Sequence, residues 1–125
     1  MNKQTPVLLI EDNEDTLDTL EILLESSGFE CRRATSRDKA LEILKSGFLP
    51  GCVLMDYMMP GMSLTRFLSE AADMNLKIML VSAHSDIHRL SKRFGIRHFI
   101  QKPIDPDELI HAVKTTIESG QHSAV

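Results

Sequence analysis

The amino-acid sequence predicts an α/β fold in which a five-stranded parallel sheet is covered by helices on both faces. Three short segments are apolar without alternation: Val7–Ile10, Cys52–Met55 and Ile78–Val81. Strands of this composition are buried on both faces, as in a parallel sheet between two helical layers. Segments with apolar residues at helical spacing separate them, so strands and helices alternate along the chain.

The first helix is expected from Glu14 or Asp15 to Ser27, with acidic residues in its first turn, where the helix dipole favours them. Gly28 ends it, and Phe29–Ala34 is mixed in polarity, which favours a strand at a sheet edge. Ser36 can cap a second helix, and Leu49–Gly51 breaks the chain before the central strand. The residues predicted on the buried faces of these helices are Leu17, Leu20, Leu24, Ala40, Leu41, Leu44 and Phe48.

The third helix is expected to begin at a Ser63 cap and to end at Asn75, and the strand Lys77–Val81 follows it. A fourth helix starts at Ser85 or Asp86 and is closed by Gly95. The residues predicted to face inward from these two helices are Leu64, Phe67, Leu68, Ala71, Ile87, Leu90 and Phe94.

The short, half-polar segment His98–Gln101 predicts the fifth strand, and Asp105 or Asp107 opens the last helix. The residues predicted on its buried face are Leu109, Val113 and Ile117. Residues 119–125 have nothing to pack against, so this tail is expected to fray.

The polarity of the strands predicts their order in the sheet. The apolar first, third and fourth strands belong in the middle, and the polar second and fifth belong at the edges. Because sequential strands are usually neighbours and crossovers are right-handed, the predicted order is 2-1-3-4-5, the doubly wound (βα)5 arrangement called flavodoxin-like. Ligands of such sheets bind at the carboxyl ends of the strands, here between the first and third strands.

Length and composition predict one domain over residues 1–125, and no second domain fits. Met1 and the short tail favour a complete, stand-alone protein. No segment has the length of a membrane span or the apolar stretch of a secretory signal, so we expect a cytoplasmic location without membrane contact. A net charge of −4 and a pI near 5.7 argue against broad nucleic-acid binding, so protein partners are expected.

The two cysteines, Cys31 and Cys52, have neither metal-ligand spacing nor a CxxC arrangement, and both are interpreted as buried thiols. In the predicted topology their strands lie on either side of the first strand. They would therefore be about 10 Å apart, which is too far for a disulfide.

Acidic residues stand at the ends of two central strands: Glu11 and Asp12 after the first, and Asp56 after the third. Carboxylates that meet at one edge repel each other unless a cation lies between them, and ligands that are all oxygen favour Mg²⁺ or Mn²⁺. The cation would allow Asp56 to attack phosphorus as a nucleophile. Lys102 and Ser82 follow two other strands and can supply a positive charge and a hydroxyl donor to a phosphoryl group.

These residues, in this order, resemble the receiver domains of two-component response regulators over essentially the whole chain. The motifs are Glu11-Asp12, Asp56 with Met59-Pro60-Gly61, Ser82-Ala83 and Lys102-Pro103. The resemblance implies Mg²⁺-dependent phosphoryl transfer from a histidine kinase or a histidine phosphotransfer protein to Asp56. It also implies that the backbone carbonyl of Met58 completes the metal site, that Ser82, Ala83 and Lys102 bind the phosphate, and that the bond before Pro103 is cis.

The resemblance further implies a switch in which Ser82 moves toward the phosphate and the ring of Phe99 follows. The fourth helix, fifth strand and last helix would form the remodelled surface, which binds an acidic protein or a second copy, so that the chain is a monomer or a weak dimer. The exposed basic residues of that surface are His88, Arg89, Lys92 and Arg93.

The sequence departs from the family pattern in two places: Ser63-Leu64 replaces the usual Asp-Gly, and Ile96 replaces a smaller residue after Gly95. His84, and Met58 two residues after Asp56, are positioned to tune hydrolysis of the phosphoryl group. We expect only self-catalysed phosphoryl acceptance and slow autodephosphorylation, so the chain is not an enzyme in the ordinary sense.

Two alternatives remain open: an adaptor that acts without phosphorylation, and a phosphohydrolase with an aspartate nucleophile. An adaptor would be expected to lack the acceptor, the lysine or the acids, and all are present. Aspartate-nucleophile hydrolases tend to carry a second acid where this chain has Met58. A nucleotide-binding role has little support, because no Gly-rich loop follows the first strand.

Overall fold

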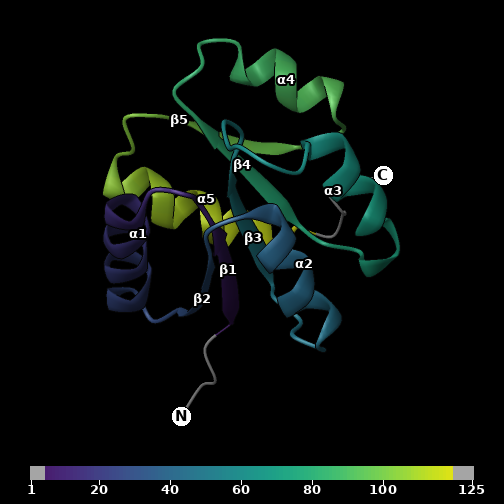
Figure 1. Ribbon diagram of the computed structural model, residues 1–125. Helices are drawn as coiled ribbons and strands as arrows, with labels where there is room; N and C mark the ends of the chain where they lie inside the picture. Colours follow the sequence, from purple (N-terminus) through teal and green to yellow (C-terminus); the bar gives the residue numbers. More distant parts are fainter. Residues whose placement is uncertain (1–4, 120–125) are drawn as a thin grey trace.

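A five-stranded parallel sheet forms the centre of the protein in a computed structural model that describes residues 5–119 (Figure 1). The strands are β1 (Pro6–Ile10), β2 (Glu30–Ala34), β3 (Cys52–Asp56), β4 (Ile78–Ser82) and β5 (His98–Gln101). Their order is β2-β1-β3-β4-β5, which confirms the predicted topology. The expected fraying of residues 119–125 falls almost entirely outside the described residues.

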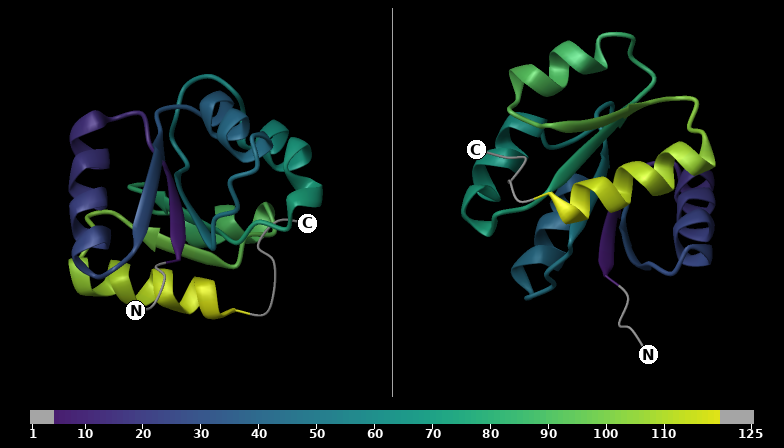
Figure 2. Two further views of the ribbon diagram at one scale, coloured as in Figure 1. Left: turned by 90° about the horizontal axis from the view of Figure 1, so that it is seen from below. Right: turned by 180° about the vertical axis from the view of Figure 1, so that it is seen from behind.

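Within the described residues, five α-helices cover the sheet, α1 and α5 on one face and α2, α3 and α4 on the other (Figure 2). Their bounds are α1 (Glu14–Ser26), α2 (Arg37–Lys45), α3 (Leu64–Glu70), α4 (Ile87–Arg93) and α5 (Pro106–Glu118). Alternate residues of each central strand enter opposite layers, so that β1 gives Val7 and Leu9 to one core and Leu8 and Ile10 to the other. Among residues 5–119, no helix has the length and apolar character needed to cross a bilayer.

Side-chain caps start four of the helices. Asn13, Ser36, Ser63 and Asp105 each accept a hydrogen bond from the backbone N–H three residues later, which confirms the caps predicted at Ser36 and Ser63. Asp86 precedes α4 without such a bond.

The two cysteines lie on either side of β1, because Val7 pairs with Cys31 in β2 and with Cys52 in β3. Both are free thiols, as predicted. Cys52 is buried, but Cys31 is only half-buried because β2 is an edge strand. Burial raises the pKa of each thiol to about 12, so both stay protonated and act as small apolar side chains.

The third helix is shorter than predicted. α3 ends at Glu70, and a 3₁₀ turn over Ala72–Met74 carries the chain on to Asn75, which is left-handed with φ of 56°. The prediction therefore placed the end of the α-helix five residues too late, although Asn75, which tolerates the left-handed conformation, does end the helical segment as a whole.

Four other predicted core positions are only half-buried. Phe48 lies beyond the end of α2, where the Arg32 guanidinium covers its ring 4.7 Å from the centroid. In α4, Leu90 and Phe94 are half-buried and Ser91 is buried beside Ile87. In α5, Ile117 is half-buried and the neighbouring Thr116 is buried instead. The Thr116 hydroxyl can be buried because it donates a hydrogen bond to the carbonyl of Ala112 at 2.8 Å.

Replacing Phe67 by alanine tests the packing of α3 on the sheet. Its ring is fully buried, so Phe67→Ala should lower the free energy of unfolding by about 3–5 kcal/mol, measured by urea denaturation. Ile22→Ala is the control, because Ile22 is 68% exposed and its truncation should change stability by less than about 0.5 kcal/mol. An equal loss for the two variants would contradict this description of the core.

Candidate functional site

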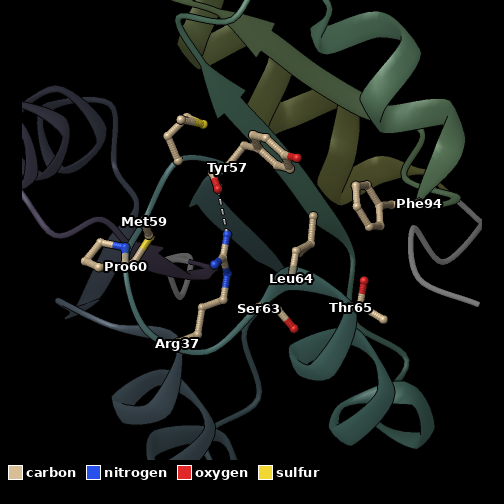
Figure 3. Close-up of a pocket in the computed structure, with 9 residues that line it drawn as sticks. Arg37, Tyr57, Met59, Pro60, Ser63, Leu64, Thr65 and Phe94 are labelled. Carbon is tan, nitrogen blue, oxygen red and sulfur yellow. Dashed lines mark hydrogen bonds between the residues drawn. The ribbon is translucent and has the colours of Figure 1, made fainter.

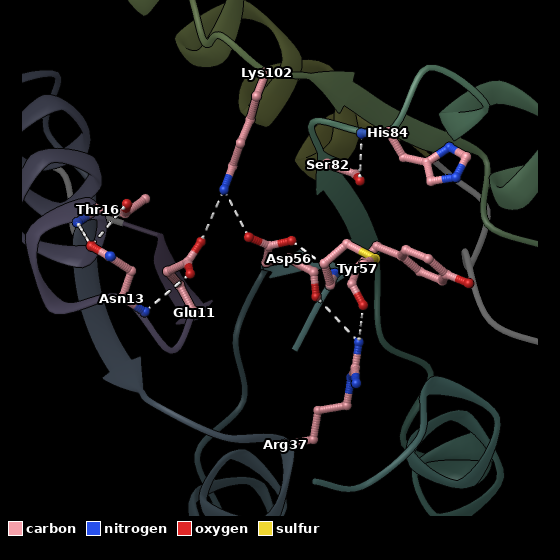
Figure 4. A network of polar contacts seen from close by, with 10 residues as sticks. Glu11, Asn13, Thr16, Arg37, Asp56, Tyr57, Ser82, His84 and Lys102 are labelled. Atoms are coloured by element: carbon pink, nitrogen blue, oxygen red, sulfur yellow. Dashed lines mark hydrogen bonds and ion pairs between the residues drawn. The ribbon is translucent and has the colours of Figure 1, made fainter. Parts of the chain in front are cut away.

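The carboxyl ends of β1, β3 and β5 bring Glu11, Asp56 and Lys102 together (Figure 4). Lys102 Nζ lies 2.7 Å from Asp56 Oδ2 and 3.4 Å from Glu11 Oε1. Glu11 is 4% exposed and Asp56 is 7% exposed, so a single ammonium group forms ion pairs with two buried acids. The Lys102 backbone is anchored by its N–H, which donates to the Ser82 carbonyl at 2.8 Å.

A backbone N–H binds the second oxygen of each buried carboxylate. Asn13 N donates to Glu11 Oε2 at 3.1 Å, and Met58 N donates to Asp56 Oδ1 at 2.9 Å. Each donor lies two residues after its acceptor, in the loop that follows the strand. Both acids are therefore oriented by their own loops as well as by Lys102.

Glu11 and Asp56 are buried close together, and the single positive charge of Lys102 does not balance two negative charges. Burial raises the pKa of Glu11 to about 7, and the neighbouring Asp56 and Asp12 act in the same direction, while the Asn13 N–H opposes them. Burial also works against the charge of Lys102, but contact with Asp56 and Glu11 outweighs it and raises the pKa of the ammonium. Lys102 therefore stays charged, and the Glu11 carboxyl gains or loses its proton near neutral pH.

The predicted metal residues form an oxygen-rich group, with Asp12 exposed at the rim beside Glu11. Within residues 5–119, no three acidic, histidine or cysteine side chains are gathered as a ready-made metal site. The chemistry of the donors nevertheless fits Mg²⁺ or Mn²⁺, since two buried carboxylates share one monovalent cation.

Ser82 lies at the end of β4, beside β3, whose last residue is Asp56 (Figure 4). It is fully buried, and its hydroxyl oxygen accepts a hydrogen bond from His84 N at 3.0 Å. The hydroxyl hydrogen remains as a donor. Ala83 and His84 are exposed, and His84 Nδ1 accepts from the backbone N–H of Asp86 at 3.0 Å.

Phe99 lies on the same face of the sheet as Ser82, because Phe99 pairs with Leu80, two residues before Ser82. The half-buried ring contacts His88 of α4 edge-on, with 5.4 Å between the ring centroids. The peptide bond between Lys102 and Pro103 is cis, as expected.

Arg37, the first residue of α2, is a residue of this site that the sequence did not reveal. It is 2% exposed, and its guanidinium donates to the backbone carbonyls of Asp56 and Tyr57, on the side of this backbone away from Lys102 (Figure 4). An arginine at the start of an amphipathic helix is normally solvated, so the sequence contains no signal for this contact.

A cavity of about 580 Å³ adjoins Arg37 between the β3–α3 loop and the end of α4 (Figure 3). The rings of Tyr57 and Phe94 pack against each other in its wall, with centroids 6.1 Å apart and ring planes inclined by 49°. Its lining residues are Arg37, Tyr57, Met58, Met59, Pro60, Ser63, Leu64, Thr65 and Phe94.

The raised pKa of Glu11 predicts how stability depends on pH without metal. Between about pH 4.5 and 7 the folded protein keeps a proton on Glu11 that the unfolded chain releases, so the free energy of unfolding falls as pH rises through this window. The fall should be about 3 kcal/mol and should be absent in Glu11→Gln. Urea unfolding in EDTA across this range measures the difference between the two proteins. A difference that does not change with pH would show that Glu11 has an ordinary pKa.

Curated relatives of this chain are regulators of transcription and sensory transduction. FixJ of Azorhizobium caulinodans is 31% identical over 124 residues, covering 94% of this chain and 57% of the relative. RegX3 of Mycobacterium tuberculosis is 32% identical over 120 residues, covering 93% of this chain and 52% of the relative. The chain thus spans about half the length of the curated relatives it matches.

Solved structures support the same relationship. A putative response regulator from Chloroflexus aurantiacus is 27% identical with a TM-score of 0.82, over 94% of this chain and 100% of that one. The response regulator TrrA from Thermotoga maritima, described in complex with Mg²⁺-BeF, is 25% identical with a TM-score of 0.79, over 90% and 99% of the chains. Residues 7–114 match the model of the response regulator receiver domain. This chain therefore belongs to the receiver domain family of response regulators.

Proposed function

We propose that the protein accepts a phosphoryl group on Asp56 from a histidine kinase or a histidine phosphotransfer protein and relays that signal to another protein. The geometry of Asp56 is the observation that supports this most strongly. Its buried carboxylate ends β3 and is held between Lys102 Nζ at 2.7 Å and the Met58 N–H at 2.9 Å. It is thus oriented, and a cation already faces the place where phosphate oxygens would gather.

In the proposed transfer, an Asp56 carboxylate oxygen attacks phosphorus and the bond to the donor imidazole nitrogen breaks. The phosphoryl group becomes an acyl phosphate and the electron pair remains with the imidazole. Lys102 would pair with the phosphoryl oxygens, and the Ser82 hydroxyl and the Ala83 N–H would donate to them.

Glu11, Asp12, Asp56 and the Met58 carbonyl would hold the Mg²⁺ or Mn²⁺. The bound ion would offset the negative charge of donor and acceptor. The Mg²⁺-BeF complex of TrrA supports this part of the proposal by analogy.

The proposed output surface combines α4, β5 and α5. Phe99 contacts α4 through His88, and its strand partner is two residues from Ser82, so a shift of Ser82 toward phosphate would alter the packing of α4. Packing would carry this signal, because the phenylalanine has no hydroxyl. The exposed basic side chains on α4 fit an acidic protein partner or a weakly bound second copy: His88, Arg89, Lys92 and Arg93.

Several wider features belong to the same proposal. The protein would be a cytoplasmic receiver that binds proteins rather than nucleic acid or membrane, and residues 1–125 would form one receiver domain. Its phosphoryl group would be lost by slow autodephosphorylation, tuned by the exposed residues Met58 and His84 at the rim of the site. Met58 is 62% exposed and has no acidic function, which disfavours an aspartate-nucleophile hydrolase. An adaptor that acts without phosphorylation is disfavoured because Asp56 and Lys102 are both present and in contact.

Incubation with Mg²⁺ and acetyl phosphate tests the acceptor assignment. The unmutated protein should gain the mass of one phosphoryl group, and neither Asp56→Asn nor a sample in EDTA should gain it, because the carboxylate nucleophile or the metal is missing. Intact-protein mass spectrometry measures the gain. Undiminished labelling of Asp56→Asn would place the acceptor elsewhere.

Replacing Phe99 by alanine tests the switch separately from the chemistry. Phe99→Ala should leave phosphorylation of Asp56 unchanged but abolish the phosphorylation-dependent shifts of α4 amide resonances, because the ring that contacts His88 is absent. Amide NMR spectra before and after acetyl phosphate treatment measure this. Wild-type shifts in the variant would rule out signalling through Phe99.

A further inference from the structure

The guanidinium of Arg37 is buried beneath the loop that joins β3 to α3. Its Nη2 donates to the carbonyls of Asp56 at 3.2 Å and Tyr57 at 2.9 Å, its Nη1 donates to the carbonyl of Met62 at 2.9 Å, and its Nε contacts Met55 Sδ at 3.4 Å. One side chain therefore binds both ends of the loop that carries the acceptor.

A buried guanidinium is costly because it leaves water, and burial lowers the pKa of Arg37 from its ordinary value while the charge of Asp56 opposes that shift. Among residues 5–119, no carboxylate forms an ion pair with Arg37. The carbonyl oxygens of Asp56, at the end of β3, and of Tyr57 and Met62, in the loop that follows, accept its hydrogen bonds instead. In the described part of the chain, all oxygen acceptors of the guanidinium are therefore backbone carbonyls at the end of β3 and in the β3–α3 loop.

The peptide group between Tyr57 and Met58 is held at both ends. Its carbonyl oxygen, on Tyr57, accepts from Arg37 Nη2, and its N–H, on Met58, donates to Asp56 Oδ1 at 2.9 Å. In a planar trans peptide the C=O and N–H point in opposite directions, so fixing the oxygen also aims the N–H. Arg37 consequently sets the direction of the backbone donor that orients the acceptor carboxylate.

The contact with Met62 extends this constraint to the end of the loop. Ser63 and Leu64 follow in positions where the loop enters α3, and Gly61 has a φ of +89°. Arg37 spans the turn from Tyr57 to Met62, which contains Gly61, and so ties the start of the loop to the residue before the Ser63 cap of α3.

We propose that Arg37 is a positioning residue for phosphoryl acceptance, which fixes the Tyr57–Met58 peptide so that the Met58 N–H orients the Asp56 carboxylate. The effect on reactivity rests on the proposed function, whereas the effect on the loop does not. Removing a residue that orients a metal-binding group typically costs about 10- to 100-fold in metal affinity or activity. Losses in this range are expected for Mg²⁺ binding and for the rate of phosphorylation.

Three measurements on Arg37→Met and Arg37→Lys test the inference. Hydrogen exchange of the Met58 amide reports the loop without any ligand. Fluorescence of Tyr57, the only tyrosine of a chain without tryptophan, reports Mg²⁺ affinity beside the site. Acetyl phosphate with Mg²⁺ gives the rate of phosphorylation. In Arg37→Met the Met58 amide should exchange faster, and Mg²⁺ affinity and the rate of phosphorylation should both fall. Arg37→Lys should recover only part of each property, because a lysine ammonium lacks the planar, forked donors of a guanidinium.

Two control variants separate positioning from stability and from charge. Phe67→Ala lowers stability through the same core layer but should retain the Mg²⁺ affinity of its folded fraction. Arg66→Met removes a positive charge from the surface of α3, where Arg66 pairs with Glu70, and should retain all three properties.

Wild-type exchange of the Met58 amide, Mg²⁺ affinity and rate in Arg37→Met would overturn the inference. If Arg37→Met does not fold, Arg37→Lys decides: wild-type behaviour in all three measurements would overturn the inference, and a loss in the folded variant would support it. If the unmutated protein gains no phosphoryl group, the proposed function fails, and the Met58 exchange rate still decides whether Arg37 holds the loop.

Discussion

The burial of two carboxylates against a single ammonium group is the interaction on which the site depends. Glu11 and Asp56 lie at the ends of adjacent parallel strands, and Lys102 reaches both from the end of β5. One positive charge cannot offset two buried negative charges, and the raised pKa of Glu11 expresses that imbalance. The same imbalance would favour binding of a divalent ion between the two acids, which is the ion that the proposed phosphoryl transfer requires.

The parallel sheet explains why these residues meet. Every strand runs in the same direction, so the residues that follow β1, β3, β4 and β5 share one edge, although they are separated by up to 91 positions in sequence. The two helical layers bury both faces of the central strands and leave that edge as the place where polar groups can reach solvent. Arg37 adds a constraint from beneath by fixing the carbonyls of the loop that carries Asp56.

Much of the fold followed from the sequence, because strand polarity reports burial. The apolar β1, β3 and β4 are central and the polar β2 and β5 are edges, and this also predicted that Asp56 and Lys102 would meet. Prediction from sequence patterns assumes that polar residues are exposed, so the burial of Thr116 and Arg37 was not predicted. Thr116 is buried because its own helix supplies an acceptor. Arg37 is buried because the carbonyls of residues 56, 57 and 62, distant from it in sequence, accept its hydrogen bonds. The spacing of polar and apolar residues carries no information about such contacts.

Proton release on Mg²⁺ binding tests the electrostatic claim most directly, because a metal that binds Glu11 must displace its proton. Calorimetric titrations with Mg²⁺ in two buffers of different ionisation enthalpy measure that release. If the two acids are short of positive charge, binding near pH 6.5 releases a substantial fraction of one proton, and the release disappears above about pH 8.5 and in Glu11→Gln. Mg²⁺ binding that releases no proton near pH 6.5, or no binding at any of these pH values, would contradict it.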